Sequence, residues 1–148
     1  MRKKTTLSTE EIFQLIKDKS CFSEVSSLAD ASFNNQSASE YLLQLIAERE
    51  VSKQDVIRLA NIERSYGYQI FRGTRTPSRD VLLSISIVMQ LSVEETQHLL
   101  RIFNRGALYP KIKRDAAIIY CLCNGLNLID TEILLDEIKQ SALTRGKT

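Results

Sequence analysis

Helix-start signals recur along this chain and limit it to a largely helical fold. In three places a serine is followed three residues later by a glutamate, which is the pattern of a capping box. These pairs are Ser8 with Glu11, Ser37 with Glu40, and Ser92 with Glu95. Apolar residues at helical spacing follow each signal, and only 5 glycines and 2 prolines interrupt 148 residues. The sequence therefore predicts an all-α protein with nearly no strand.

The same signals place the individual helices. We expect helices over residues 8–19, 37–50, 52–60, 64–71, 77–88, 92–103, 110–123 and 127–138. Asn61 and Gly73 are typical helix stops because both residue types tolerate the left-handed backbone conformation. Pro110 is expected in the first turn of its helix, where its missing N–H is harmless. Residues 20–36 have a mixed pattern, in which the polar run over 34–37 suggests a linker, and residues 141–148 are expected to be a frayed tail.

The length of 148 residues suits one hydrophobic core with a helical extension. We expect an N-terminal helix and linker over 1–36, a central domain over 37–106, and a helical extension over 107–148 packed on the same core. Residues 91–100 and 126–135 also match at several positions, at an offset of 35 residues. This similarity indicates a second helical hairpin stacked on the first, although recurring caps and leucines alone could produce it.

Several classes of protein are disfavoured. The weakly charged run over residues 81–91 is shorter than the roughly 20 residues of a membrane span. Residues 5–11 are polar where a signal peptide would be apolar, so a cytoplasmic protein without membrane contact is expected. The chain has no Gly-rich phosphate loop and no convincing nucleophile with a neighbouring base, which argues against an enzyme.

No cofactor or metal is expected. His98 is the only histidine, and a helical position among leucines favours a structural role for it over metal ligation. The cysteines at 21, 121 and 123 are an odd number, and buried thiols are the favoured interpretation of the Cys121/Cys123 pair.

Basic residues are concentrated in two stretches of a chain whose net charge is only +2. Residues 64–79 contain four arginines and no acidic residue, and residues 105–114 contain two arginines and two lysines. Any attraction to nucleic acid must come from such local concentration of charge. Within the second stretch, Lys111 to Arg114 could extend a DNA-binding surface, but this run is interpreted as a solvated turn because a helix start is a poor place for cations.

Three short motifs carry a resemblance to a known family. They are Val51-Ser52-Lys53, Asn61-Ile62, and the loop from Arg72 through Gly73-Thr74-Arg75-Thr76-Pro77 to Ser78. With them, residues 37–103 resemble the Cro and phage-repressor (Xre-type) helix-turn-helix family. The resemblance implies a five-helix lambda-repressor-like domain here, between an N-terminal helix and a C-terminal helical hairpin. The recognition helix would start near Arg64.

This sequence departs from the family at the crossing of its two central helices. The family usually has alanine at the position of Ile57 and a β-branched residue at the position of Gly67, so the two sizes are exchanged here. We expect the exchange to compensate, with Gly67 making room for Ile57. Asn61 replaces the usual turn glycine.

The resemblance also implies which residues contact DNA. By position, the base-reading sites fall on Arg64, Ser65 and Gln69, with Tyr68 beside them, and these types suit hydrogen bonding to base edges. Lys53, Arg72 and Arg75 would hold phosphates. The alternative is that these arginines form an ordinary solvated surface. Tyr66 and Phe71 are expected in the core.

Sequence-specific binding of double-stranded DNA by a bacterial transcriptional regulator, a repressor in the first instance, is therefore the expected function. The alternative is an antitoxin or adaptor that keeps the fold as a scaffold and binds a protein partner through its C-terminal helices. A homodimer is left open. In a two-fold dimer the two recognition helices would face half-sites about 34–36 Å apart.

Overall fold

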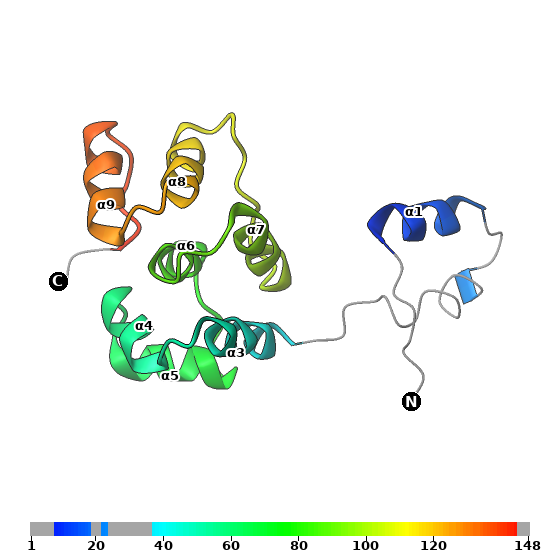
Figure 1. Ribbon diagram of the computed structural model, residues 1–148, viewed down its shortest axis with the longest axis horizontal. Coiled ribbons are helices and arrows are strands. Elements are labelled where there is room, and N and C mark those ends of the chain that lie inside the picture. The colour runs from blue at the N-terminus through cyan, green and yellow to red at the C-terminus, as the bar shows by residue number, and fades with distance from the viewer. Residues whose placement is uncertain (1–7, 19–21, 24–36, 145–148) are drawn as a thin grey trace. The chain divides into compact units, whose positions relative to one another are not determined.

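The computed structural model describes residues 8–18, 22–23 and 37–144, and these residues are helical without strands. The helices are α1 (Thr9–Asp18), α3 (Ala38–Arg49), α4 (Lys53–Leu59), α5 (Arg64–Arg72), α6 (Arg79–Val88), α7 (Val93–Ile102), α8 (Lys113–Cys123) and α9 (Leu128–Glu137) (Figure 1). The chain divides into two compact units, residues 1–36 and 37–148. Across the described residues, no helix has the length and apolar character needed to cross a membrane.

In the first unit, α1 begins as its sequence predicts. The Ser8 hydroxyl accepts the backbone N–H of Glu11, and the Glu11 carboxylate accepts that of Ser8. The hydrogen bonds from Ser8 lower the pKa of Glu11. No residue of α1 is buried. The expected linker lies mostly outside the described residues, as do Cys21 and the last four residues of the tail.

Local chemistry sets the helix boundaries of the second unit. Six helices begin at a residue whose side chain accepts a backbone N–H from the first turn. These residues are Ser37, Ser52, Glu63, Ser78, Ser92 and Asn127. Asn61 (φ 58°) and Gly73 (φ 82°) follow α4 and α5 in the left-handed conformation. The predicted stops are therefore confirmed.

Helix α6 is the centre of the second unit. Its residues Leu82, Leu83 and Ile85 are fully buried, and α4, α7, α8 and α9 all pack on it. Figure 1 shows α6 and α8 between α7 on one side and α9 on the other. One hydrophobic core therefore runs from Leu42 in α3 to Leu143 beyond α9.

The α8–α9 hairpin repeats the α6–α7 hairpin at an offset of 35 residues. Arg79 binds Asp115 and donates to the carbonyls of residues 106 and 107. Its counterpart Arg114 binds Asp80 and donates to the carbonyls of residues 141 and 142. Each arginine thus closes its own hairpin and pairs with the acid of the other one. The two hairpins hold each other by a reciprocal exchange of ion pairs.

Smaller features repeat as well. The Gln97 side chain hydrogen-bonds the backbone N–H of Leu108, and its counterpart Glu132 accepts the N–H of Leu143. The side chains of Thr96 and Thr131 are both fully buried and both donate to the carbonyl of their helix cap. The similarity of residues 91–100 to 126–135 thus corresponds to a repeated hairpin.

Two expectations about this region are wrong. Helix α8 begins at Lys113, not at Pro110, because the Tyr109 N–H binds the Asp115 carboxylate and the Ile112 N–H binds the Tyr109 carbonyl, which closes a turn. The expectation that both thiols are buried is wrong for Cys123, which is exposed. Cys121 is buried, and this burial raises the pKa of its thiol. The two thiols are two residues apart on a helix and so point in different directions.

Candidate nucleic-acid interface

Helices α4 and α5 cross where Ile57 meets Gly67. A Cβ atom on Gly67 would lie 2.6 Å from Cγ1 of Ile57, closer than atoms can approach. Ile57 is 3% exposed, so its side chain fills the space that Gly67 leaves open. The exchange of sizes expected at this crossing is therefore present in the structure.

The cap and the buried face of α5 set its orientation. Glu63 caps the helix by accepting the N–H groups of Tyr66 and Ser65, and these hydrogen bonds lower the pKa of its carboxyl group. Ile70 and Phe71 are buried in the core. The opposite face of α5 therefore points toward solvent.

The predicted base-reading residues lie on this outward face to different degrees. Arg64 and Ser65 are exposed, whereas Tyr68 and Gln69 are half-buried. The guanidinium of Arg64 lies 5.9 Å from the ring centre of Tyr68. Tyr68 also packs against the edge of the core, as Tyr66 does. The Tyr68 ring therefore packs against the Arg64 guanidinium, and part of the ring remains accessible to solvent.

The loop after α5 brings a further cation to the same face. Gly73 turns the chain, and the Thr74 hydroxyl donates to the carbonyl of Gln69. The Arg75 guanidinium stacks 4.9 Å from the ring centre of Tyr66 and lies 3.4 Å from Oε1 of Gln69. Gln69 and Arg75 are thus linked through their side chains, which the sequence did not suggest.

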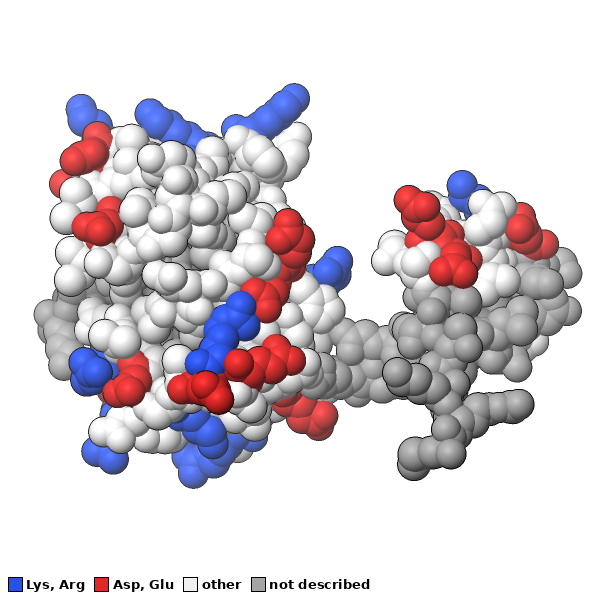
Figure 2. All heavy atoms as spheres, viewed as in Figure 1, with Lys and Arg blue, Asp and Glu red and all other residues white. Residues whose placement is uncertain are grey.

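Most cations of α4, α5 and the two basic stretches fall into two groups. Within the described part of the chain, Lys53, Arg64, Arg72 and Arg75 are exposed and form no ion pair with a carboxylate. Figure 2 shows basic side chains projecting from the lower edge of this unit, where α4 and α5 lie. These four are the predicted cations of the interface.

The other arginines have protein partners. Arg79 and Arg114 bind the acids described above, and Arg105 donates twice to the carbonyl of Pro77. The interpretation of residues 111–114 as a solvated turn is therefore wrong for Arg114, whose side chain is 14% exposed. The Arg-Asp dipeptides at 79–80 and 114–115 are a sequence signal that could have indicated this pairing.

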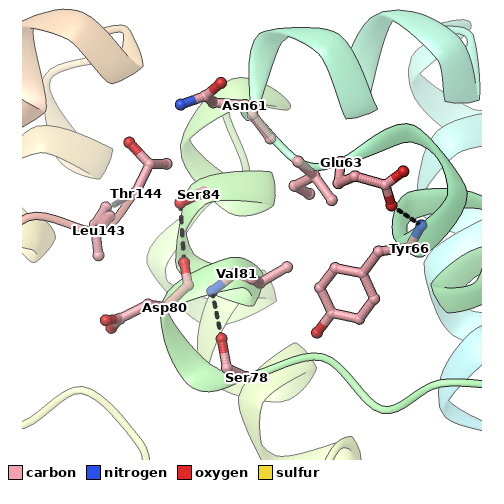
Figure 3. Close-up of a pocket in the computed structure, with 11 residues that line it drawn as sticks. Asn61, Glu63, Tyr66, Ser78, Asp80, Val81, Ser84, Leu143 and Thr144 are labelled. Carbon is pink, nitrogen blue, oxygen red and sulfur yellow. Dashed lines mark hydrogen bonds between the residues drawn. The ribbon is translucent and has the colours of Figure 1, made fainter. Parts of the chain in front are cut away.

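A pocket of about 430 Å³ lies between the α4–α5 turn, α6 and the segment after α9 (Figure 3). Several of its polar groups already form hydrogen bonds within the fold: Glu63 accepts the Tyr66 N–H, Ser78 accepts the Val81 N–H, and Ser84 donates to the Asp80 carbonyl. In the described parts of the chain, no buried side-chain polar atom lacks a hydrogen-bond partner. The same residues contain no cluster of three or more potential metal ligands. The pocket therefore indicates no particular ligand.

No protein-family model, curated protein or solved structure matches this chain. The likeness to the Cro and phage-repressor family rests on the residues quoted above. The geometry of α4, α5 and the following loop is therefore the basis for any statement of function.

Proposed function

We propose that this protein is a sequence-specific double-stranded DNA-binding regulator of transcription. In this proposal α4 and α5 form a helix-turn-helix, and α3 to α7 are the five-helix domain of the Xre type. One observation carries the proposal: within the described part of the chain, four exposed cations of α4, α5 and the following loop form no ion pair with a carboxylate, while Arg58, Arg79 and Arg114 are paired within the protein. The exposed acid beside Arg64, Glu63, is engaged by backbone N–H groups at the start of α5.

The residues of α5 would read bases in the major groove. Arg64 can donate two hydrogen bonds to guanine, and Gln69 can pair with adenine, each for about 1–3 kcal/mol of discrimination. Arg75 lies against Gln69 and would restrict its rotamers, which favours specific contact. Ser65 and Tyr68 are the secondary candidates on this face.

The remaining cations would bind phosphates. Lys53 begins α4, Arg72 ends α5, and Arg75 follows in the loop, so they lie around the recognition helix. Such contacts fix the position of a protein on DNA and do not distinguish sequences. The overall net charge of +2 adds little, so binding should depend on these few contacts and on salt.

The experiment begins with selection of bound duplexes from a random DNA library, followed by fluorescence anisotropy on the selected duplex at two salt concentrations. The full chain should bind the selected duplex at least about 10³-fold more tightly than random duplex. The Arg64→Ala/Gln69→Ala variant should lose most of this preference. Arg72→Ala should weaken all duplexes alike and reduce the salt slope by about 1.

Arg58→Ala is the matched control, because Arg58 is an exposed arginine of α4 that pairs with Asp55. It should bind as the unchanged protein does. If no duplex is enriched, or if Arg64→Ala/Gln69→Ala retains the full preference, the proposal is wrong. The scaffold alternative, in which the protein acts by binding another protein, would then be favoured.

A further inference from the structure

The C-terminal end of α4 and the outer face of α9 enclose an open groove of about 820 Å³. Three large aliphatic side chains line it, and each is more than half exposed: Leu59 at 52%, Ile129 at 71% and Ile133 at 51%. Figure 1 shows α4 and α9 on the same side of the second unit. Exposed aliphatic residues that converge from two helices are typical of a binding surface.

The repeated hairpin shows that the fold does not need these aliphatic residues. The counterparts of Ile129 and Ile133 in the first hairpin are Glu94, which is exposed, and His98. The same hairpin thus forms with polar residues at both positions. Ile129 and Ile133 are therefore not explained by the internal packing of the hairpin.

The charge around the groove is acidic. Helix α9 carries Asp130, Glu132, Asp136 and Glu137 and has no basic residue. Asp136 and Glu137 line the groove itself, and Arg58 on the opposite wall already pairs with Asp55. A second copy of this chain would bring acids of α9 against acids of α9. A partner with basic residues beside its apolar face would instead meet complementary charge.

The first hairpin shows how such a face is covered by a helix. The ring of Tyr41 in α3 packs edge-on 4.6 Å from His98, and Arg49 of α3 pairs with Glu95. The counterparts of His98 and Glu95 on α9 are Ile133 and Asp130. A helix lying on α9 in a similar way would place an apolar side chain on Ile133 and a basic one near Asp130.

We propose that the groove between α4 and α9 binds an amphipathic helix of another protein, with Lys or Arg residues flanking an aliphatic face. None of the residues proposed to contact DNA lines this groove. The inference does not depend on DNA binding.

The test uses two fluorescently labelled helical peptides with the same leucine pattern, one with lysine and one with glutamate at the remaining positions. The full chain should bind the leucine–lysine peptide, and the leucine–glutamate peptide at least about tenfold more weakly. Ile129→Ser/Ile133→Ser should weaken the lysine peptide by about tenfold or more, because the aliphatic contact is lost. Both residues are exposed, so the variant should fold, as far-ultraviolet circular dichroism will check.

Tyr120→Ser is the matched control, since Tyr120 is 57% exposed on α8 and outside the groove. It should leave peptide binding unchanged. The proposal is overturned if both peptides bind equally or if the lysine peptide does not bind. It is also overturned if Tyr120→Ser weakens peptide binding as much as Ile129→Ser/Ile133→Ser does. Self-association in sedimentation velocity that Ile129→Ser/Ile133→Ser abolishes would also overturn it, because a second copy would then occupy the groove.

Discussion

At the scale of single residues, Gly67 and Ile57 decide how closely α4 approaches α5. The close contact between them leaves no room for a methyl group on Gly67. Helix propensity opposes this effect, because alanine is more favourable than glycine inside a helix by about 1 kcal/mol. The steric effect should dominate, since Ile57 is enclosed by the core and cannot move away.

We predict that Gly67→Ala lowers the free energy of unfolding by about 1–3 kcal/mol. In an Ile57→Ala background the same change should instead raise it, by up to about 1 kcal/mol, because the clash is gone and helix propensity remains. Urea denaturation of the four proteins in this double-mutant cycle measures both effects. A stabilising effect of Gly67→Ala alone would contradict the packing described here.

At the scale of elements, the two reciprocal ion pairs between the hairpins differ in how deeply their acids are buried. The Asp115 side chain is 3% exposed and accepts from Arg79 and from the Tyr109 N–H, whereas the Asp80 side chain is 40% exposed. We predict that Asp115→Ala lowers the free energy of unfolding by about 3–5 kcal/mol, because it removes a buried carboxylate and leaves both the Arg79 guanidinium and the Tyr109 N–H without that acceptor. Asp80→Ala should cost less, about 1–3 kcal/mol, because only the Arg114 guanidinium loses a partner and it keeps two carbonyl acceptors. Equal losses in urea denaturation would show that burial does not govern these pairs.

The ion pair between α3 and α7 should make stability depend on pH. Burial raises the pKa of Glu95, but hydrogen bonds from Ser92 and the charge of Arg49 outweigh it, so the pKa lies below its ordinary 4.5. A carboxyl group with a lowered pKa stabilises the fold above its unfolded pKa and ceases to do so as the pH falls through its folded value. This contribution is therefore fully present at neutral pH and is lost as the pH falls from about 4.5 through the lower folded pKa.

We predict that Glu95→Gln loses about 1 kcal/mol of unfolding free energy at neutral pH. Its difference from the unchanged protein should shrink as the pH falls below 4.5. Thermal or urea denaturation across this range measures the difference, and Glu94→Gln, an exposed change in the same helical turn, is the control. A difference that stays constant with pH would rule out the ionised pair as its source.

At the scale of the whole molecule, the C-terminal hairpin belongs to the same core as the proposed DNA-binding domain. Helices α8 and α9 both pack on α6, and Asp115 neutralises Arg79. We predict that a chain ending at Leu108 loses cooperative unfolding, because the apolar face of α6 and the guanidinium of Arg79 become exposed. Calorimetry tests this. A cooperative transition at the temperature of the full chain would show that residues 109–148 are an independent appendage.

The sequence by itself determined most helix boundaries. Caps such as Ser52 and Ser92, and stops such as Asn61, act on backbone groups within four residues, so the local sequence contains both partners. The crossing of Ile57 with Gly67 was also predicted, although through a family resemblance. For the candidate site, the sequence predicted which cations are present but not the contact of Arg75 with Gln69.

Tertiary structure alone decided which arginines remain free. Arg79, Arg105 and Arg114 looked like parts of basic surfaces, but their partners are carbonyls and carboxylates at least 27 residues away. The acidic apolar groove likewise exists only because α4 and α9 come together. Neither result could follow from local patterns, because a guanidinium on a helix surface looks the same in sequence whether water or another helix faces it.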